Sequence, residues 1–179
     1  MGTVILLGVV FGIIYFAFSS SFSPIPFFPT NGKDLPKIID TLKLKNDQIV
    51  FDLGAGTGTV IFAAATEAHK KGLNTKFIAI DINFVLSTVM HIRRMFHPNA
   101  AHIEIKSEDL FKFKYTDAVK SFKHLTFYMY VSPWYTDPMT QTIIDIKKSA
   151  HIVSYFYPIK MLKAVAHHKG ENGIFVYRV

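Results

Sequence analysis

A glycine cluster between a buried strand and a helix constrains the fold of this 179-residue chain more than any other feature. Residues 49–53 form a short apolar run, typical of a buried strand, and lead into Asp52-Leu53-Gly54-Ala55-Gly56-Thr57-Gly58. An alanine-rich helix is predicted directly afterwards, over residues 60–71. Glycines let the backbone turn tightly and approach a ligand, and the start of a helix offers free N–H groups. We therefore expect a ligand site where this strand ends.

Strand and helix patterns alternate along the rest of the chain. Leu35, Ile38, Ile39 and Leu42 give one apolar helical face, and further helices are predicted over 84–96 and 138–148. Buried strands are predicted over 76–81, 102–106, 125–131 and 150–155, and two more in 161–179, turning at 170–173. This alternation indicates an α/β fold whose sheet is mostly parallel and carries helices on both faces.

Two cofactor patterns compete for the glycine cluster. The dinucleotide fingerprint requires glycines at its first, third and sixth positions, but the sixth position here is Thr59. Glycines at the first, third and fifth positions, with an acid two residues before them, are typical of S-adenosylmethionine sites. Asp52, Gly54, Gly56 and Gly58 match this second pattern.

Acidic residues at later strand ends support the same interpretation. Asp81 ends the second strand, where an acid holds ribose hydroxyls. Glu108 and Asp109 follow the third strand as two candidates for holding the adenine amino group, and Asp109 is the preferred one. Asp52 or Asp81 alone is more simply a helix cap or a solvated carboxylate. Their joint placement favours a cofactor site, and the predicted cofactor residues in this part of the chain are Asp52, Gly54, Ala55, Gly56, Gly58, Asp81, Ile82, Glu108 and Asp109.

The first 32 residues contain no charged side chain and no histidine. Their uncharged stretch of about 20 residues would span roughly 30 Å as a helix, so we expect a membrane anchor over 1–22. A signal peptide is one alternative, but it would need a basic region that this segment lacks. A buried core helix is the other alternative. A linker over 23–32 and a catalytic domain over 33–179 would follow. Lysines after the span predict a single-pass protein with its domain on the cytoplasmic side, in a mitochondrial membrane if the source is eukaryotic.

Composition excludes several classes of function. The chain has no cysteine, which excludes a disulfide scaffold, a thiolate zinc site and a cysteine nucleophile. The histidines show no spacing typical of metal ligands, so no metal is predicted. A net charge of +7 suits acidic partners and permits nucleic acid without requiring it.

Four features of the chain, the last of them made of two segments, resemble small membrane-anchored class I protein-lysine methyltransferases. That family includes the enzymes for the ATP synthase c-subunit and the adenine nucleotide translocase, together with prokaryotic relatives. The resemblance is carried by the apolar front segment, Pro26-Phe27-Phe28-Pro29-Thr30, residues 50–58, and the final segments 150–158 and 173–177. The sequence departs from the family pattern at Thr57-Gly58-Thr59, where Asp-Gly-Arg is usual, and at Asp81, where Glu is usual.

The resemblance implies a Rossmann-like sheet with an antiparallel last strand, preceded by one hydrophobic helix. It implies S-adenosylmethionine as cofactor and, as acceptor, an accessible lysine of a protein at or in the membrane. Phe27, Phe28, Pro29 and Thr30 would then lie over the methionine end of the cofactor. Tyr130, Ser132 and Trp134, which follow the fourth strand, would form the acceptor channel.

Three other functions remain open from the sequence. Ser132-Pro133-Trp134-Tyr135 is similar to the motif by which nucleic-acid amino-methyltransferases hold a flipped base, but Trp134 replaces its second proline. A membrane-lipid amine methyltransferase would also suit an anchored enzyme. The last alternative is a catalytically inactive membrane scaffold.

Overall fold

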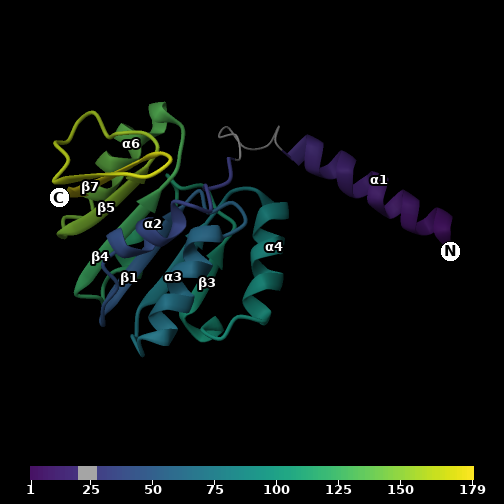
Figure 1. The fold of residues 1–179 in the computed structure, drawn as a ribbon, viewed down its shortest axis with the longest axis horizontal. Coiled ribbons are helices and arrows are strands. Elements are labelled where there is room, and N and C mark those ends of the chain that lie inside the picture. The colour runs from purple at the N-terminus through teal and green to yellow at the C-terminus, as the bar shows by residue number, and fades with distance from the viewer. Residues whose placement is uncertain (20–27) are drawn as a thin grey trace.

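The computed structural model describes residues 1–19 and 28–179, and it describes side chains for 1–12 and 28–179. A single seven-stranded sheet forms the centre of the described chain (Figure 1), with strand order β3-β2-β1-β4-β5-β7-β6. The strands are β1 (Gln48–Leu53), β2 (Lys76–Ile80), β3 (Ile103–Lys106), β4 (His124–Met129), β5 (Ala150–Tyr155), β6 (Ala166–Lys169) and β7 (Gly173–Arg178).

The first five strands are parallel, and β7 runs antiparallel between β5 and β6. Because β1 lies between β2 and β4, the glycine cluster emerges at the middle of the edge where the parallel strands end. Asp52 is paired with Ala79 on one side and with Tyr128 on the other. The topology thus gathers the loops after β1, β2 and β4 at one place.

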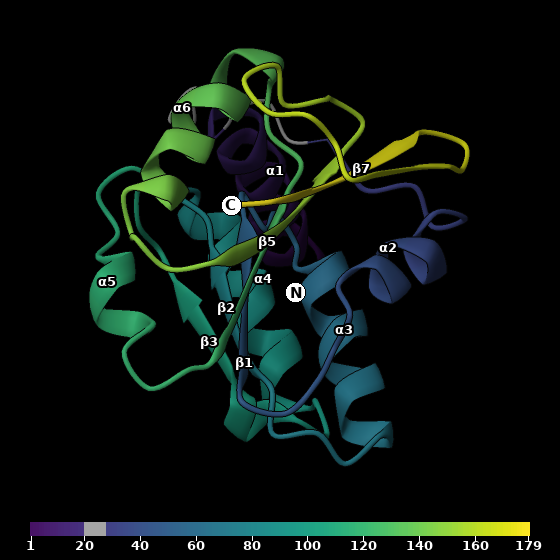
Figure 2. The ribbon, with the colours of Figure 1, turned by 90° about the vertical axis from the view of Figure 1, so that its left-hand side faces the viewer.

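Helices cover both faces of the sheet, with α2 and α3 on one side and α5 and α6 on the other (Figure 2). The helices of the described chain are α1 (Gly2–Ser19), α2 (Leu35–Thr41), α3 (Thr59–Lys70), α4 (Phe84–Met95), α5 (Tyr115–Ala118) and α6 (Pro133–Ile144), with a 3-10 turn at Ala100–His102. Met90 of α4 packs into the same apolar cluster as α2 and α3.

Alternation along β1 divides the core into two layers. Ile49, Phe51 and Leu53 face α5 and α6, and the Phe51 ring stacks on that of Phe127 with the centroids 4.8 Å apart. Val50 faces α2 and α3 in the other layer. All six residues of β1 are buried, as expected of a central strand covered on both faces.

The structure confirms the predicted α/β architecture, the mostly parallel sheet and the antiparallel last strand. Two helices differ from prediction. The helix expected over 138–148 begins at Pro133 instead, because this proline is equally suited to a first helical turn. The short α5 is missing from the prediction, since its four residues are too few to show a helical period.

The prediction of a membrane anchor is wrong. Helix α1 occupies the apolar front segment from Gly2 to Ser19. Within residues 1–19 and 28–179, no helix combines the length and the apolar character that a crossing requires. The single-pass localisation predicted from that anchor is overturned with it. Residues 20–22 of the expected anchor, 23–27 of the expected linker, and Phe27 lie outside the described residues.

Candidate functional site

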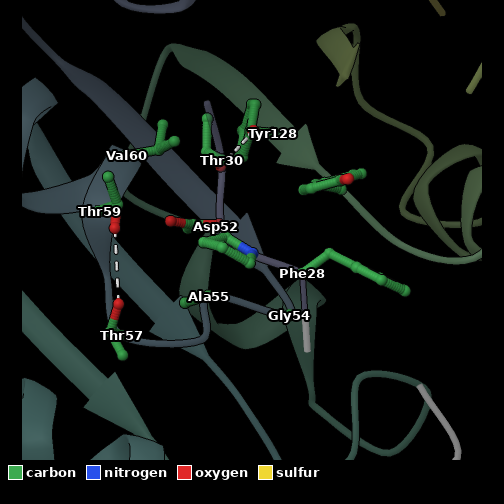
Figure 3. Close-up of a pocket in the computed structure, with 11 residues that line it drawn as sticks. Phe28, Thr30, Asp52, Gly54, Ala55, Thr57, Thr59, Val60 and Tyr128 are labelled. Carbon is green, nitrogen blue, oxygen red and sulfur yellow. Dashed lines mark hydrogen bonds between the residues drawn. The ribbon is translucent and has the colours of Figure 1, made fainter. Parts of the chain in front are cut away.

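A pocket that is open to solvent lies where β1 and β4 end (Figure 3). Its lining comes from the segment before α2, the end of β1, the glycine loop, the start of α3 and the end of β4. The lining residues are Phe28, Pro29, Thr30, Asp52, Gly54, Ala55, Thr57, Thr59, Val60, Tyr128 and Tyr130.

The shape of the glycine loop depends on three residues with backbone conformations that residues other than glycine rarely adopt. Gly54, Gly56 and Gly58 have φ angles of +73°, +58° and +77°. The N–H groups of Gly54 and Ala55 both donate to the carbonyl of Ile80, at 2.9 and 3.0 Å, which fastens the loop to the end of β2. The sequence pattern therefore reflects a backbone requirement at each of its three glycines.

Asp52 is buried below the loop and points at the start of α3. Its carboxylate accepts a hydrogen bond from the Ile61 N–H, one of the donors that a first helical turn leaves unpaired. Burial raises the pKa of Asp52 to about 7, and the nearby Asp81 adds to this rise, while the Ile61 hydrogen bond opposes it. In the residues that the structure describes side chain by side chain, neither aspartate belongs to an ion pair.

Asp52→Asn is expected to remove a pH-dependent loss of stability from the free protein. The folded-state pKa of about 7 lies above the ordinary 3.8, so the stability from this group is present below pH 3.8 and is lost as the pH rises through 7. Asparagine keeps an acceptor for Ile61 but does not ionise. Relative to the variant, the wild type should lose up to about 1.4 kcal/mol of unfolding free energy per pH unit across this window. Urea unfolding at several pH values measures the difference, and a constant difference would contradict the assignment.

Asp81 connects the glycine loop to α4. One carboxylate oxygen accepts the Gly56 N–H at 2.7 Å and the other accepts the Asn83 N–H at 2.8 Å. Asn83 in turn caps α4 by accepting from the N–H groups of Val85 and Leu86. Burial raises the pKa of Asp81, although both backbone hydrogen bonds oppose that rise.

The segment before α2 is held over the pocket by two sets of contacts. The hydroxyls of Thr30 and Tyr128 lie 3.3 Å apart (Figure 3). Further along, the buried carboxylate of Asp34 accepts hydrogen bonds from the Tyr155 hydroxyl at 2.8 Å and from the backbone N–H groups of Glu171 and Asn172 at 2.7 and 3.0 Å. Burial alone would raise the pKa of Asp34, but these donors outweigh it and the pKa lies below its usual value. The turn between β6 and β7 thus fixes the start of α2.

The structure brings together seven of the residues predicted from the sequence: Phe28, Pro29, Thr30, Asp52, Gly54, Ala55 and Tyr130 all line the pocket. Gly56, Gly58 and Asp81 frame the loop beside it. The roles assigned to these residues stay predictions.

The remaining predicted residues do not line the pocket. Ile82 is 44% exposed and Glu108 is also exposed. Asp109 accepts the Phe111 N–H within a local turn. Ser132 is buried at the start of α6, and Trp134 is 64% exposed, with its ring near that of Tyr135.

Sequence reasoning missed four of the lining residues: Thr57, Thr59, Val60 and Tyr128. Tyr128 carried a usable signal, because it lies two positions before Tyr130 and alternate residues of a strand share a face. Thr57 and Thr59 lie within or beside the glycine motif, but that pattern predicts roles for the glycines and not for the residues between them.

No family model matches the chain. A curated relative, a protein-lysine N-methyltransferase of Saccharolobus islandicus (strain REY15A), is 34% identical over 59 residues. The match spans 33% of this chain and 34% of that protein, so it reaches only about a third of the relative's length.

Solved structures resemble the chain over most of its length. An RNA methyltransferase from Salinibacter ruber, in complex with S-adenosyl-L-homocysteine, aligns with a TM-score of 0.69 at 15% identity, covering 84% of this chain and 93% of that one. A precorrin-6y C5,15-methyltransferase from Geobacter metallireducens gives 0.57 at 14%, covering 83% and 87%. A SAM-dependent methyltransferase from Geobacter sulfurreducens, also with S-adenosyl-L-homocysteine, gives 0.54 at 15%, covering 79% and 55%. At these identities the likeness establishes the fold, which is the Rossmann-like fold of S-adenosylmethionine-dependent methyltransferases.

Proposed function

We propose that this chain, with its class I methyltransferase fold, is an S-adenosylmethionine-dependent N-methyltransferase that modifies lysine side chains of proteins. One observation carries the proposal. The glycine loop, Asp52 and the segment from Phe28 to Thr30 border a single pocket at the ends of β1 and β4. In open α/β sheets, ligands bind at this edge.

The residues of the pocket fit S-adenosylmethionine. Positive-φ glycines let the backbone lie against the ligand, and the carboxylates of Asp52 and Asp81 lack ion-pair partners in the side chains described, which suits a ligand with positive charge. Asp81 would hold the ribose hydroxyls of the cofactor, and Asp52 would lie in the pocket beneath the glycine loop. When bound, the cofactor supplies an electrophilic methyl group on a sulfonium.

The protein's part in such a transfer is alignment and exclusion of water. The lysine amine must arrive neutral and in line with the methyl group, and desolvation by the pocket wall lowers a lysine pKa toward that form. Burial raises the pKa values of Tyr128 and Tyr130, so both phenols stay neutral beside the amine. Neutral hydroxyls can orient an amine without adding a charge.

The charge around the pocket supports a protein acceptor over a nucleic acid. The loops at the ends of the parallel strands and the β6–β7 turn comprise residues 28–34, 54–58, 81–83, 107–114, 130–132, 156–165 and 170–172. They contain five lysines (33, 112, 114, 160 and 163) and five acids (34, 81, 108, 109 and 171). The whole excess of +7 therefore lies elsewhere in the chain, whereas a surface that grips phosphates gathers its lysines and arginines at the site. The match to a curated protein-lysine N-methyltransferase supports the same choice.

The purified chain is expected to bind S-adenosylmethionine in calorimetry and to transfer radiolabelled methyl groups to a cell extract. Label should appear in the protein fraction and, after hydrolysis, as methyllysine. The Asp81→Ala variant serves as the matched control for background. Label in RNA or lipid instead would contradict lysine as the acceptor and favour one of the other acceptors. Absence of S-adenosylmethionine binding would contradict the proposal that the chain is a methyltransferase.

A further inference from the structure

We propose that Phe156 is a specificity-determining residue that, with Tyr130, forms the aromatic wall guiding an amine-bearing aliphatic chain into the pocket. The inference rests on the proposed function and adds to it a residue outside the pocket lining. It follows from the ring contacts of Phe156, its exposure and its backbone conformation.

Tyr130, a lining residue of the pocket, is held between two other aromatic rings. Tyr155 meets it edge-on, with ring centroids 4.9 Å apart, and Phe156 stacks on it at 6.0 Å with 29° between the planes. The Tyr155 hydroxyl donates to the buried Asp34, which fixes Tyr155 in turn. Tyr130 is therefore rigidly placed, and Phe156 extends the same aromatic surface outward, since Phe156 is 42% exposed.

The backbone at Phe156 adopts a conformation that favours glycine. Its φ angle is +73°, and the Tyr157 N–H donates to the Tyr155 carbonyl at 2.9 Å, closing a three-residue turn centred on Phe156. Turns of this kind with positive φ are rare and strained. The Phe156 N–H donates to Gly173 at 2.8 Å and the Ser154 hydroxyl donates to the Tyr157 carbonyl at 2.6 Å, so the surroundings hold the strained form in place.

Strain of this kind, at the edge of a pocket, is a reason to look for function. Glycine would relieve the strain, whereas phenylalanine places a half-exposed ring against the rings of Tyr130 and Tyr157, with centroids 6.0 and 4.7 Å away. The strained turn holds a large ring beside Tyr130. Two fixed aromatic faces suit a lysine side chain, whose methylenes pack on the rings and whose ammonium group is attracted to them before it loses its proton.

The decisive experiment compares Phe156→Ala, Phe156→Gly and Phe156→Tyr in the full chain with Phe111→Ala as control. Phe111 matches Phe156 in exposure, at 41%, and lies at the same edge of the sheet, but its ring packs near that of Tyr135, with the centroids 5.9 Å apart. Steady-state kinetics would use a protein acceptor found in the labelling experiment. Calorimetry would give the dissociation constant for S-adenosylmethionine, and thermal unfolding would give stability.

Both Phe156→Ala and Phe156→Gly should lower kcat/KM for the protein acceptor by about 10-fold or more, the scale of a lost pocket contact. Their cofactor affinity should stay unchanged, and Phe156→Gly should unfold at a higher temperature than Phe156→Ala, because only glycine relieves the strained turn. Phe156→Tyr should restore activity, and Phe111→Ala should leave it unaltered.

Equal losses of cofactor affinity and acceptor turnover in both variants would reduce Phe156 to a structural role and overturn the inference. Wild-type kinetics in both variants would overturn it too, while leaving the proposed function intact. A wild-type chain that binds S-adenosylmethionine but labels no protein would reject the lysine acceptor and the inference together.

Discussion

Asp81→Ala is expected to weaken S-adenosylmethionine binding by roughly 10- to 100-fold, the effect of losing hydrogen bonds to a charged partner worth about 1.5–3 kcal/mol. Two causes act together. The carboxylate that would hold the ribose hydroxyls disappears, and the N–H groups of Gly56 and Asn83 lose the acceptor that joins the glycine loop to the start of α4. Calorimetric titration of the cofactor measures the loss.

Asp137→Ala separates these causes from general destabilisation. Asp137 also accepts two backbone N–H bonds, from Lys160 at 2.9 Å and Met161 at 3.2 Å, but it does so on α6, outside the pocket lining. It should cost comparable stability and leave cofactor affinity unchanged. If Asp81→Ala binds the cofactor as tightly as the wild type, the assignment of this edge as the cofactor site is wrong.

The sheet could be predicted because its sequence signals are local. Apolar runs such as 49–53 and 76–80 are too short for helices and are separated by helical patterns, and a parallel sheet covered on both faces follows from that alternation. The sequence signals of the acid at the end of β1 and of the glycines after it are equally local, because each glycine is required by the positive φ angle at its own position. These parts of the site were predictable for the same reason as the strands.

The rest of the site depends on contacts between distant residues. Tyr128 reaches the pocket because β4 pairs with β1 and because Thr30, 98 positions earlier, lies against its hydroxyl. Phe156 stacks on Tyr130 because β5 lies beside β4. The sequence around each of these residues does not indicate its distant partner. The apolar front segment failed in another way, since its composition suggested a membrane span, whereas no helix within residues 1–19 and 28–179 meets the requirements for one.

Gly58 is packed more tightly than Gly54 in the glycine loop. A Cβ atom there would lie 2.7 Å from two ring atoms of Phe62 and 3.2 Å from Met90. The Phe62 ring cannot easily yield, because the Arg93 guanidinium lies 4.6 Å over its centroid and the His97 ring packs at 5.4 Å. Arg93 also donates to the Thr57 carbonyl, which ties α4 to the same loop.

Gly58→Ala is therefore expected to destabilise the fold by about 2–5 kcal/mol, combining left-handed backbone strain of about 1–2 kcal/mol with overpacking of about 1–3 kcal/mol. Gly72→Ala is the matched control, because Gly72 has a φ of +64° but open space around its Cβ position. Gly72→Ala should show the cost of backbone strain without that of overpacking. Urea unfolding of both variants yields the difference, which measures the clash with Phe62. Equal losses in the two variants would mean that the ring moves aside freely. A larger loss at Gly58 would show that the packing between α3 and α4, as well as the φ angle, requires glycine at the fifth position of the motif.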